Sequence, residues 1–165
     1  MRRLFVTLLL LSSPLLASAS DSATNLQPAE ANAAAKGRVI KVLPLLLDLK
    51  HRDALSPSLY DRDAYQLYLR QHTNEISGIR CDVLWNSAHA GDTGLKLRVE
   101  LLGAGAGDLP GRATLEQTVT PGYFRRWTSL TVEGAEYRKL GALIAWRVTL
   151  WSGDRLLGEQ KSFLW

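Results

Sequence analysis

Two stretches of the sequence place arginines beside large aromatic side chains. Arg126 and Trp127 are adjacent, and Arg147 is followed four residues later by Trp151. This combination is suited to binding sugars, peptides or anions. In a strand, Arg147 and Trp151 lie on one face and Trp146 on the other. The structural alternative is that Trp146 belongs to the core and Arg147 lies on a half-covered outer face.

A third candidate surface lies between residues 58 and 71. Tyr65 and Arg62, with two further tyrosines and Arg70, give the aromatic and arginine composition found at protein interfaces. Packing of a helix against a sheet would explain the apolar half of this segment equally well.

Metal and phosphate sites are not indicated by the remaining polar residues. His51, His72 and His89 are not spaced as ligands on one helix or strand, and the sequence predicts solvated loop histidines. Residues 103–107 contain three glycines but precede no helix, so a hairpin loop is favoured over a phosphate-binding loop. The sequence therefore predicts no metal site and no cofactor.

Serine catalysis is also not indicated. No serine occupies a Gly-x-Ser-x-Gly turn, and Ser56 and Ser58 are better explained as helix caps. We therefore predict that the protein is not an enzyme.

The first 19 residues have the pattern of a secretion signal. Arg2 and Arg3 precede an apolar run, which leads to the small-residue site Ala17-Ser18-Ala19. The run is interrupted after about eight residues, whereas a spanning helix needs about 20. We expect cleavage after Ala19, a periplasmic or secreted protein, and no integral membrane segment in the mature chain.

The charge of the mature chain argues against nucleic acid as a partner. Cleavage would remove two arginines and no acidic residue, so the formal net charge falls from +4 to +2. The remaining charges are interspersed and form no basic stripe. The single cysteine, Cys81, alternates with apolar residues and is predicted to be a buried thiol.

We predict a flexible leader over residues 20–37 and one folded domain over residues 38–165. The leader is rich in Ala, Ser and Asn and has no aromatic residue. A first strand is expected over residues 39–47, where Pro44 favours a sheet edge or a bulge.

One helix is expected over residues 59–71. Ser56 or Ser58 would cap it, Pro57 suits its first turn, and Asp61 and Asp63 lie near its positive end. The spacing of three and four residues predicts a stripe that faces the domain, formed by Tyr60, Ala64, Leu67, Tyr68 and Gln71.

From residue 77 the apolar period is two, which predicts strands. The clearest cover residues 79–85, 95–101, 142–151 and 155–164, with weaker ones at 112–120 and 126–132. About seven strands with one helix after the first favour a mainly β protein, an immunoglobulin-like or fibronectin-III-like sandwich. Trp85 would be the aromatic between the sheets and Tyr137 a corner tyrosine. A small α+β or barrel-like arrangement is the alternative.

The chain ends on Phe163, Leu164 and Trp165 without a polar tail. We expect a structural last strand, with Phe163 packed in the core and Trp165 at least partly covered.

Three segments carry a family resemblance: residues 54–66, 145–151 and 159–165. In these the chain resembles a group of small exported bacterial proteins of unassigned function. The resemblance implies an exported bacterial protein with an immunoglobulin-like β-sandwich, and it implies no mechanism.

These observations favour a non-enzymatic exported protein that binds a protein partner or an envelope component through a sheet face or the helix. The alternative is a carbohydrate-binding or enzyme-accessory module that uses Trp127 or Trp151.

Overall fold

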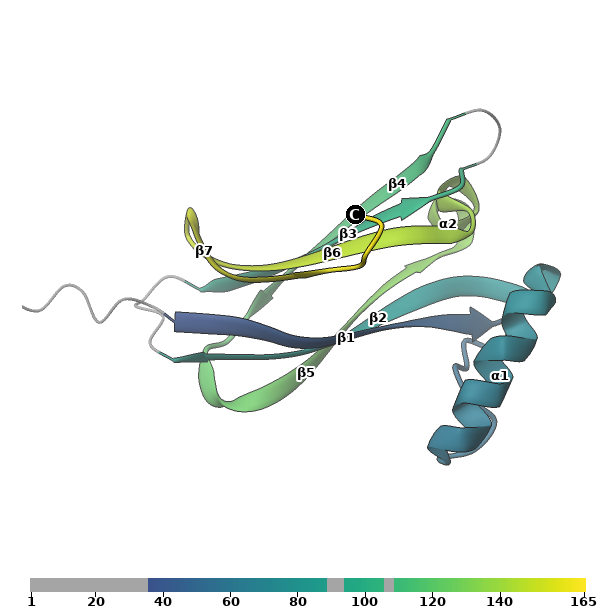
Figure 1. The fold of residues 1–165 in the computed structure, drawn as a ribbon, viewed down its shortest axis with the longest axis horizontal. Helices are drawn as coiled ribbons and strands as arrows, with labels where there is room; N and C mark the ends of the chain where they lie inside the picture. The colour runs from purple at the N-terminus through teal and green to yellow at the C-terminus, as the bar shows by residue number, and fades with distance from the viewer. Residues whose placement is uncertain (1–35, 89–93, 106–108) are drawn as a thin grey trace, which may run out of the picture. The chain divides into compact units, whose positions relative to one another are not determined.

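The computed structural model describes residues 36–88, 94–105 and 109–165. These residues form two antiparallel sheets that share one hydrophobic core, a mainly β arrangement of the sandwich type (Figure 1). One sheet has the order β1-β2-β5, from β1 (Lys36–Asp48), β2 (Ile76–Ala88) and β5 (Gly122–Glu133). The other has the order β4-β3-β6-β7, from β4 (Gly111–Val119), β3 (Leu95–Gly103), β6 (Leu143–Ser152) and β7 (Arg155–Lys161).

The predicted alternation along β2 and β3 is confirmed. The residues on their inner faces are at most 1% exposed, and they are Ile79, Cys81, Val83, Trp85, Leu95, Leu97, Val99 and Leu101. Trp85 lies in the core and donates from its indole Nε1 to Oγ1 of Thr128 on β5, at 2.9 Å. This bond satisfies the only polar group of a side chain that is otherwise suited to an apolar interior.

β1 begins two residues earlier than the predicted domain. Lys36 and Gly37 pair with Ala88 and Ser87 of β2. The last two residues of the leader predicted over residues 20–37 therefore belong to β1. A Cβ on Gly37 would lie 2.9 Å from Cδ2 of Leu150 and 3.0 Å from Cβ of Leu157, so a side chain at this position would displace both leucines. Residues 1–35, which include the predicted signal, and His89 lie outside the described residues. Pro44 is on an edge strand, as predicted.

The predicted bounds of the helix are confirmed, but its predicted buried face is wrong. α1 (Leu59–Gln71) is capped by Ser58, so Pro57 precedes the cap and is not in the first turn. The buried residues are Gln66 and Leu69, whereas Tyr60 is 83% exposed. The other four predicted stripe residues, Ala64, Leu67, Tyr68 and Gln71, are also exposed.

A second helix was not predicted. α2 (Gly134–Leu140) connects β5 to β6, and a short 3-10 helix, η1 (Thr73–Glu75), follows α1. Tyr137, the predicted corner tyrosine, lies on α2. The end of α2 packs on the β3–β4 hairpin, where a Cβ on Gly103 would lie 2.1 Å from the Leu140 carbonyl oxygen. The glycines of this hairpin thus allow close packing, and residues 106–108 of its loop lie outside the described part.

The last strand ends earlier than predicted. β7 stops at Lys161, and Ser162 continues with a backbone bond from its N–H to the carbonyl of Trp146, at 2.9 Å. Phe163 is fully exposed, so its predicted core position is wrong. Trp165 is partly covered, as predicted.

Candidate functional site

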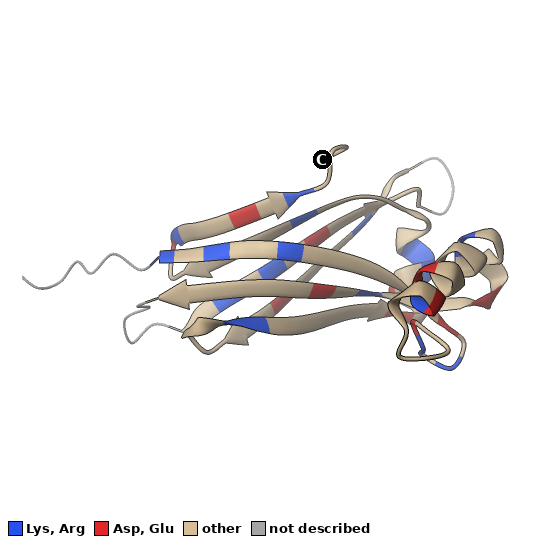
Figure 2. Ribbon diagram, turned by 60° about the horizontal axis from the view of Figure 1, so that its bottom comes forward, with Lys and Arg blue, Asp and Glu red and all other residues tan. Residues whose placement is uncertain are grey.

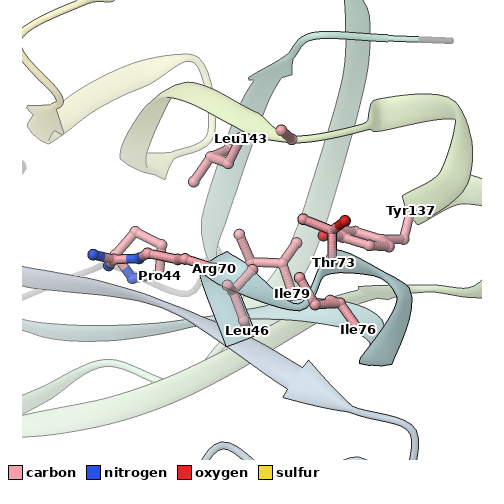
Figure 3. Close-up of a pocket in the computed structure, with 9 residues that line it drawn as sticks. Pro44, Leu46, Arg70, Thr73, Ile76, Ile79, Tyr137 and Leu143 are labelled. Atoms are coloured by element: carbon pink, nitrogen blue, oxygen red, sulfur yellow. The ribbon is translucent and has the colours of Figure 1, made fainter. Parts of the chain in front are cut away.

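A pocket of about 340 Å³ lies where both helices close one end of the two sheets (Figures 1 and 3). Its apolar wall comes from both sheets: Leu46 lies on β1, Ile79 on β2 and Leu143 on β6. Ile79 is 1% exposed and forms part of the hydrophobic core, so the pocket reaches the core itself. Pockets of about 300 to 1,000 Å³ hold small molecules, and this one is at the small end.

Three polar side chains line the same pocket. Arg70 comes from the last turn of α1, Thr73 from η1 and Tyr137 from α2. Figure 3 shows Arg70 extending toward Pro44 and Tyr137 extending toward Thr73. Burial raises the pKa of Tyr137 above its usual 10.0, so the hydroxyl stays protonated at neutral pH and can donate a hydrogen bond.

Arg62, a predicted site residue, lines a groove beside this pocket. The groove has a volume of about 310 Å³ and shares Pro44 and Arg70 with the pocket. Arg62 and Arg70 are eight residues apart on α1, so both guanidinium groups lie along one side of the helix. Nε of Arg62 is buried without a hydrogen bond, and its ion pair with Asp63 is long, at 3.5 Å.

α1 is held on β1 by Gln66. Its side-chain amide accepts from the Leu46 N–H at 2.7 Å and donates to the Leu46 carbonyl at 2.9 Å. The same amide nitrogen is 2.9 Å from the carbonyl of Asp53. Gln66 therefore satisfies backbone groups that an edge strand would otherwise leave unpaired, and it fixes the helix that carries Arg62 and Arg70.

Tyr65, another predicted site residue, has a structural contact. Its hydroxyl donates to Oδ2 of Asp48 at 2.8 Å, and Arg52 binds the same carboxylate with its backbone and its guanidinium. Burial raises the pKa of Asp48, but hydrogen bonds from Arg52, Tyr65 and the Lys50 N–H outweigh it and hold the pKa below the ordinary 3.8. Tyr65 thus anchors α1 to the end of β1.

Arg147 and Trp151 lie on the outer face of the four-stranded sheet, as predicted, and Trp146 packs against the core. Arg147 forms ion pairs with Glu159 at 3.0 Å and Glu100 at 3.6 Å. The guanidinium of Arg98 lies over the Trp151 ring, 5.9 Å from its centre. The charges of this face are therefore paired across strands, and one face of Trp151 is already covered.

Arg126 and Trp127 lie on β5, an edge strand, and point to opposite faces. Arg126 donates to the carbonyl of Thr120 at 3.3 Å. Trp127 is 52% exposed and Phe124 is 86% exposed. Residues 123–125 of β5 stand against the single residue Asn86 of β2 here, since Arg126 pairs with Trp85 and Gly122 with Ser87. This irregularity makes residues 123–125 protrude from the ladder.

The six predicted residues therefore lie in three separate regions: Tyr65 and Arg62 on α1, Arg126 and Trp127 on β5, and Arg147 and Trp151 on β6. The pocket was missed, because its lining comes from elements far apart in sequence. Only the arginine-rich composition of residues 58–71, which includes Arg70, pointed toward it.

In the described part of the chain, the histidines do not take part in a metal site. His51 lies in a loop with Nδ1 2.9 Å from Glu133, and His72 stacks on Tyr68 with 4.0 Å between ring centres. Within residues 36–88, 94–105 and 109–165, three or more His, Cys, Asp or Glu side chains nowhere come together as a metal site. Figure 2 shows residues of both charge signs along the strands and on α1.

Comparison with known proteins gives no assignment. The chain matches no protein-family model and no curated protein. A solved β-glucosidase from Kluyveromyces marxianus aligns with 78% of this chain, with 11% identity and a TM-score of 0.30. This chain spans about 14% of that enzyme, and at this TM-score the likeness carries no argument. In the described part of the chain, no helix has the length and apolar character to cross a membrane.

Proposed function

We propose that this chain is an exported, non-enzymatic protein with an immunoglobulin-like sandwich that binds a protein partner along β5. The export rests on the signal pattern of residues 1–19, and the binding role rests on the exposed edge of the three-stranded sheet. The observation that carries the proposal is that an edge strand presents Phe124 at 86% and Trp127 at 52% exposure.

The edge of β5 suits the addition of a further strand. β5 pairs with β2 on one side, and among the described residues it has no ladder on the other. An extended peptide can form backbone hydrogen bonds with such an edge, while its side chains occupy the flanking surface. Exposed aromatic side chains are typical of the residues that contribute most to binding.

The charge of the strand selects the kind of partner. Arg125 and Arg126 are both exposed, and the only acidic residue of β5 is Glu133 at its far end. A partner segment with carboxylates and aromatic or β-branched residues would complement this strand. A second copy of β5 would bring no carboxylate opposite the arginines at a central antiparallel register, so we propose an acidic segment of another protein.

Peptide selection against the purified mature chain tests this function. We expect a display library of random twelve-residue peptides to yield sequences enriched in Asp and Glu alternating with aromatic residues. Arg125→Glu should reduce the affinity of a selected peptide about tenfold, whereas Arg138→Glu, on the exposed side of α2, should not. Hydrogen exchange of the β5 amides should slow when the peptide is bound.

Three results would overturn the proposal. Selected peptides could lack acidic residues, or the β5 amides could exchange unchanged in the complex. The mature chain could instead form a dimer that Arg125→Glu abolishes. Retention on insoluble polysaccharide that is lost in Trp127→Ala would favour the carbohydrate-binding alternative.

A further inference from the structure

The pocket between the sheets combines an apolar interior with a cationic and hydroxyl-bearing rim. Its interior is formed by Leu46, Ile79 and Leu143, and its rim by Arg70, Thr73 and Tyr137. An apolar wall with a few converging polar groups is the usual composition of a small-molecule site.

The polar groups of the rim are available to a ligand. Within the described residues, the structure shows no ion pair for the Arg70 guanidinium and no hydrogen bond for the hydroxyls of Thr73 and Tyr137. The acids nearest in sequence do not line the pocket: Glu75 accepts a hydrogen bond from the hydroxyl of Tyr68 at 2.9 Å, and Glu136 pairs with Lys139 at 2.8 Å. A cation and two hydroxyl donors thus face a cavity that has no carboxylate in its wall.

The neighbouring groove extends the cationic rim. Arg62 lines it with a buried Nε that has no partner, and Arg70 lies between groove and pocket. Asp63, which also lines the groove, contacts Arg62 only at 3.5 Å, so two arginines face one carboxylate there. A ligand with a negative group at Arg70 can therefore place its apolar part in the pocket while Arg62 adds to the positive potential nearby.

We propose that this pocket binds a carboxylate with an unbranched apolar tail, of the medium-chain fatty acid class. The carboxylate would accept hydrogen bonds from Arg70 beside Pro44, because guanidinium groups bind carboxylates in bidentate fashion. The tail would lie between the sheets against Leu46, Ile79 and Leu143. The small volume, about 340 Å³, favours one medium-length chain over a two-chain lipid.

Calorimetric titration of the mature chain with decanoate and with decan-1-ol tests the assignment. We expect one decanoate to bind per chain and decan-1-ol to bind about tenfold more weakly. Arg70→Gln should weaken decanoate binding by at least tenfold, because the charge-assisted contact with the carboxylate is lost, and should leave decan-1-ol unchanged. Arg155→Gln, in the β6–β7 hairpin, is the matched control and should have no effect.

A second variant tests the location. Ala142 is exposed and lines the pocket, so Ala142→Phe should fill its opening and abolish binding of both probes without unfolding the protein. Methyl signals of Leu46, Ile79 and Leu143 should shift when decanoate binds to the unsubstituted chain. Arg125→Glu should leave the titration unchanged, which separates this site from the proposed partner surface on β5.

Several outcomes would overturn the proposal. These are equal affinities for decanoate and decan-1-ol, unchanged affinity in Arg70→Gln, or full binding in Ala142→Phe. Binding of a peptide with an apolar last residue and a free carboxyl end, in the absence of decanoate binding, would assign the pocket to a different ligand class.

Discussion

At the scale of single residues, the sequence predicts which side chains are buried more readily than which side chains are hydrogen-bonded to one another. Cys81 was predicted from strand alternation to be a core thiol, and it is fully buried. Asp48 was not singled out in the sequence, because its significance depends on Arg52 and Tyr65, which reach it from a loop and a helix. Alternation reveals burial along a strand, but not which polar groups surround a carboxylate at the strand end.

Cys81 should react slowly with thiol reagents in the native protein. Burial raises the pKa of its thiol to about 12, so the reactive thiolate is scarce at neutral pH and the sulfur is also shielded. We expect labelling by a disulfide reagent to be slow in buffer and rapid in concentrated urea, followed by absorbance. Rapid labelling of the native chain would contradict the core position of β2.

Asp48→Asn should destabilise the protein by about 1.5 to 3 kcal/mol at neutral pH, as expected for hydrogen bonds to a charged group. The pKa of Asp48 is lowered in the folded state, so its contribution is present above the unfolded-state value of about 3.9 and is lost as the pH falls below it. Urea unfolding at pH 7 and pH 3 measures this. Asp63→Asn, at an exposed site, is the control and should change the free energy of unfolding little. An equal loss of stability from both substitutions would argue against a stabilising role for the hydrogen bonds of Asp48.

At the scale of elements, the sequence predicts the strands closely, but it predicts neither the buried face of α1 nor the presence of α2. Period-two alternation locates β2 and β3, because a strand with one buried face repeats apolar residues at every second position. The ends of α1 follow from its serine cap, but its buried face does not, because Gln66 is polar and is buried by bonding to Leu46. α2 has seven residues and no side-chain cap, so it left no clear signal.

Gln66→Leu should loosen α1 from β1. Leucine keeps most of the volume but leaves the N–H and carbonyl of Leu46 without their partner, at a cost of about 1 to 3 kcal/mol. We expect a lower urea midpoint, together with faster hydrogen exchange at Leu46 and along α1. Gln71→Leu, at an exposed position of the same helix, is the control and should change neither; faster exchange in both variants would mean that helix propensity, not the amide, holds α1.

At the scale of the molecule, what could not be predicted is how segments distant in sequence meet. The pairing of β2 with β5 and of β3 with β6 brings together residues 35 to 57 positions apart, and no local pattern encodes such a pairing. The pocket depends on it, because Leu46, Ile79 and Leu143 come from three strands in two sheets. Sequence patterns therefore indicated the layers of the sandwich, but not the cavity at its end.

The two sheets also meet along one side, where β1 and β7 are edge strands of different sheets and lie close together. The contact depends on Gly158: a Cβ there would lie 3.0 Å from both the Cα of Arg38 and the N of Val39, which are backbone atoms and cannot turn aside. Gly158→Ala should gain about 0.5 to 1 kcal/mol from the lower chain entropy of alanine. Crowding against the backbone of β1 should cost more, about 1 to 3 kcal/mol, so we expect a net loss of stability in Gly158→Ala.

Gly94→Ala is the matched control for Gly158→Ala, because its Cβ would meet only the Thr118 methyl group, at 3.2 Å. Urea unfolding of both variants decides the matter: if Gly158→Ala is as stable as Gly94→Ala, β1 and β7 do not close this side of the sandwich.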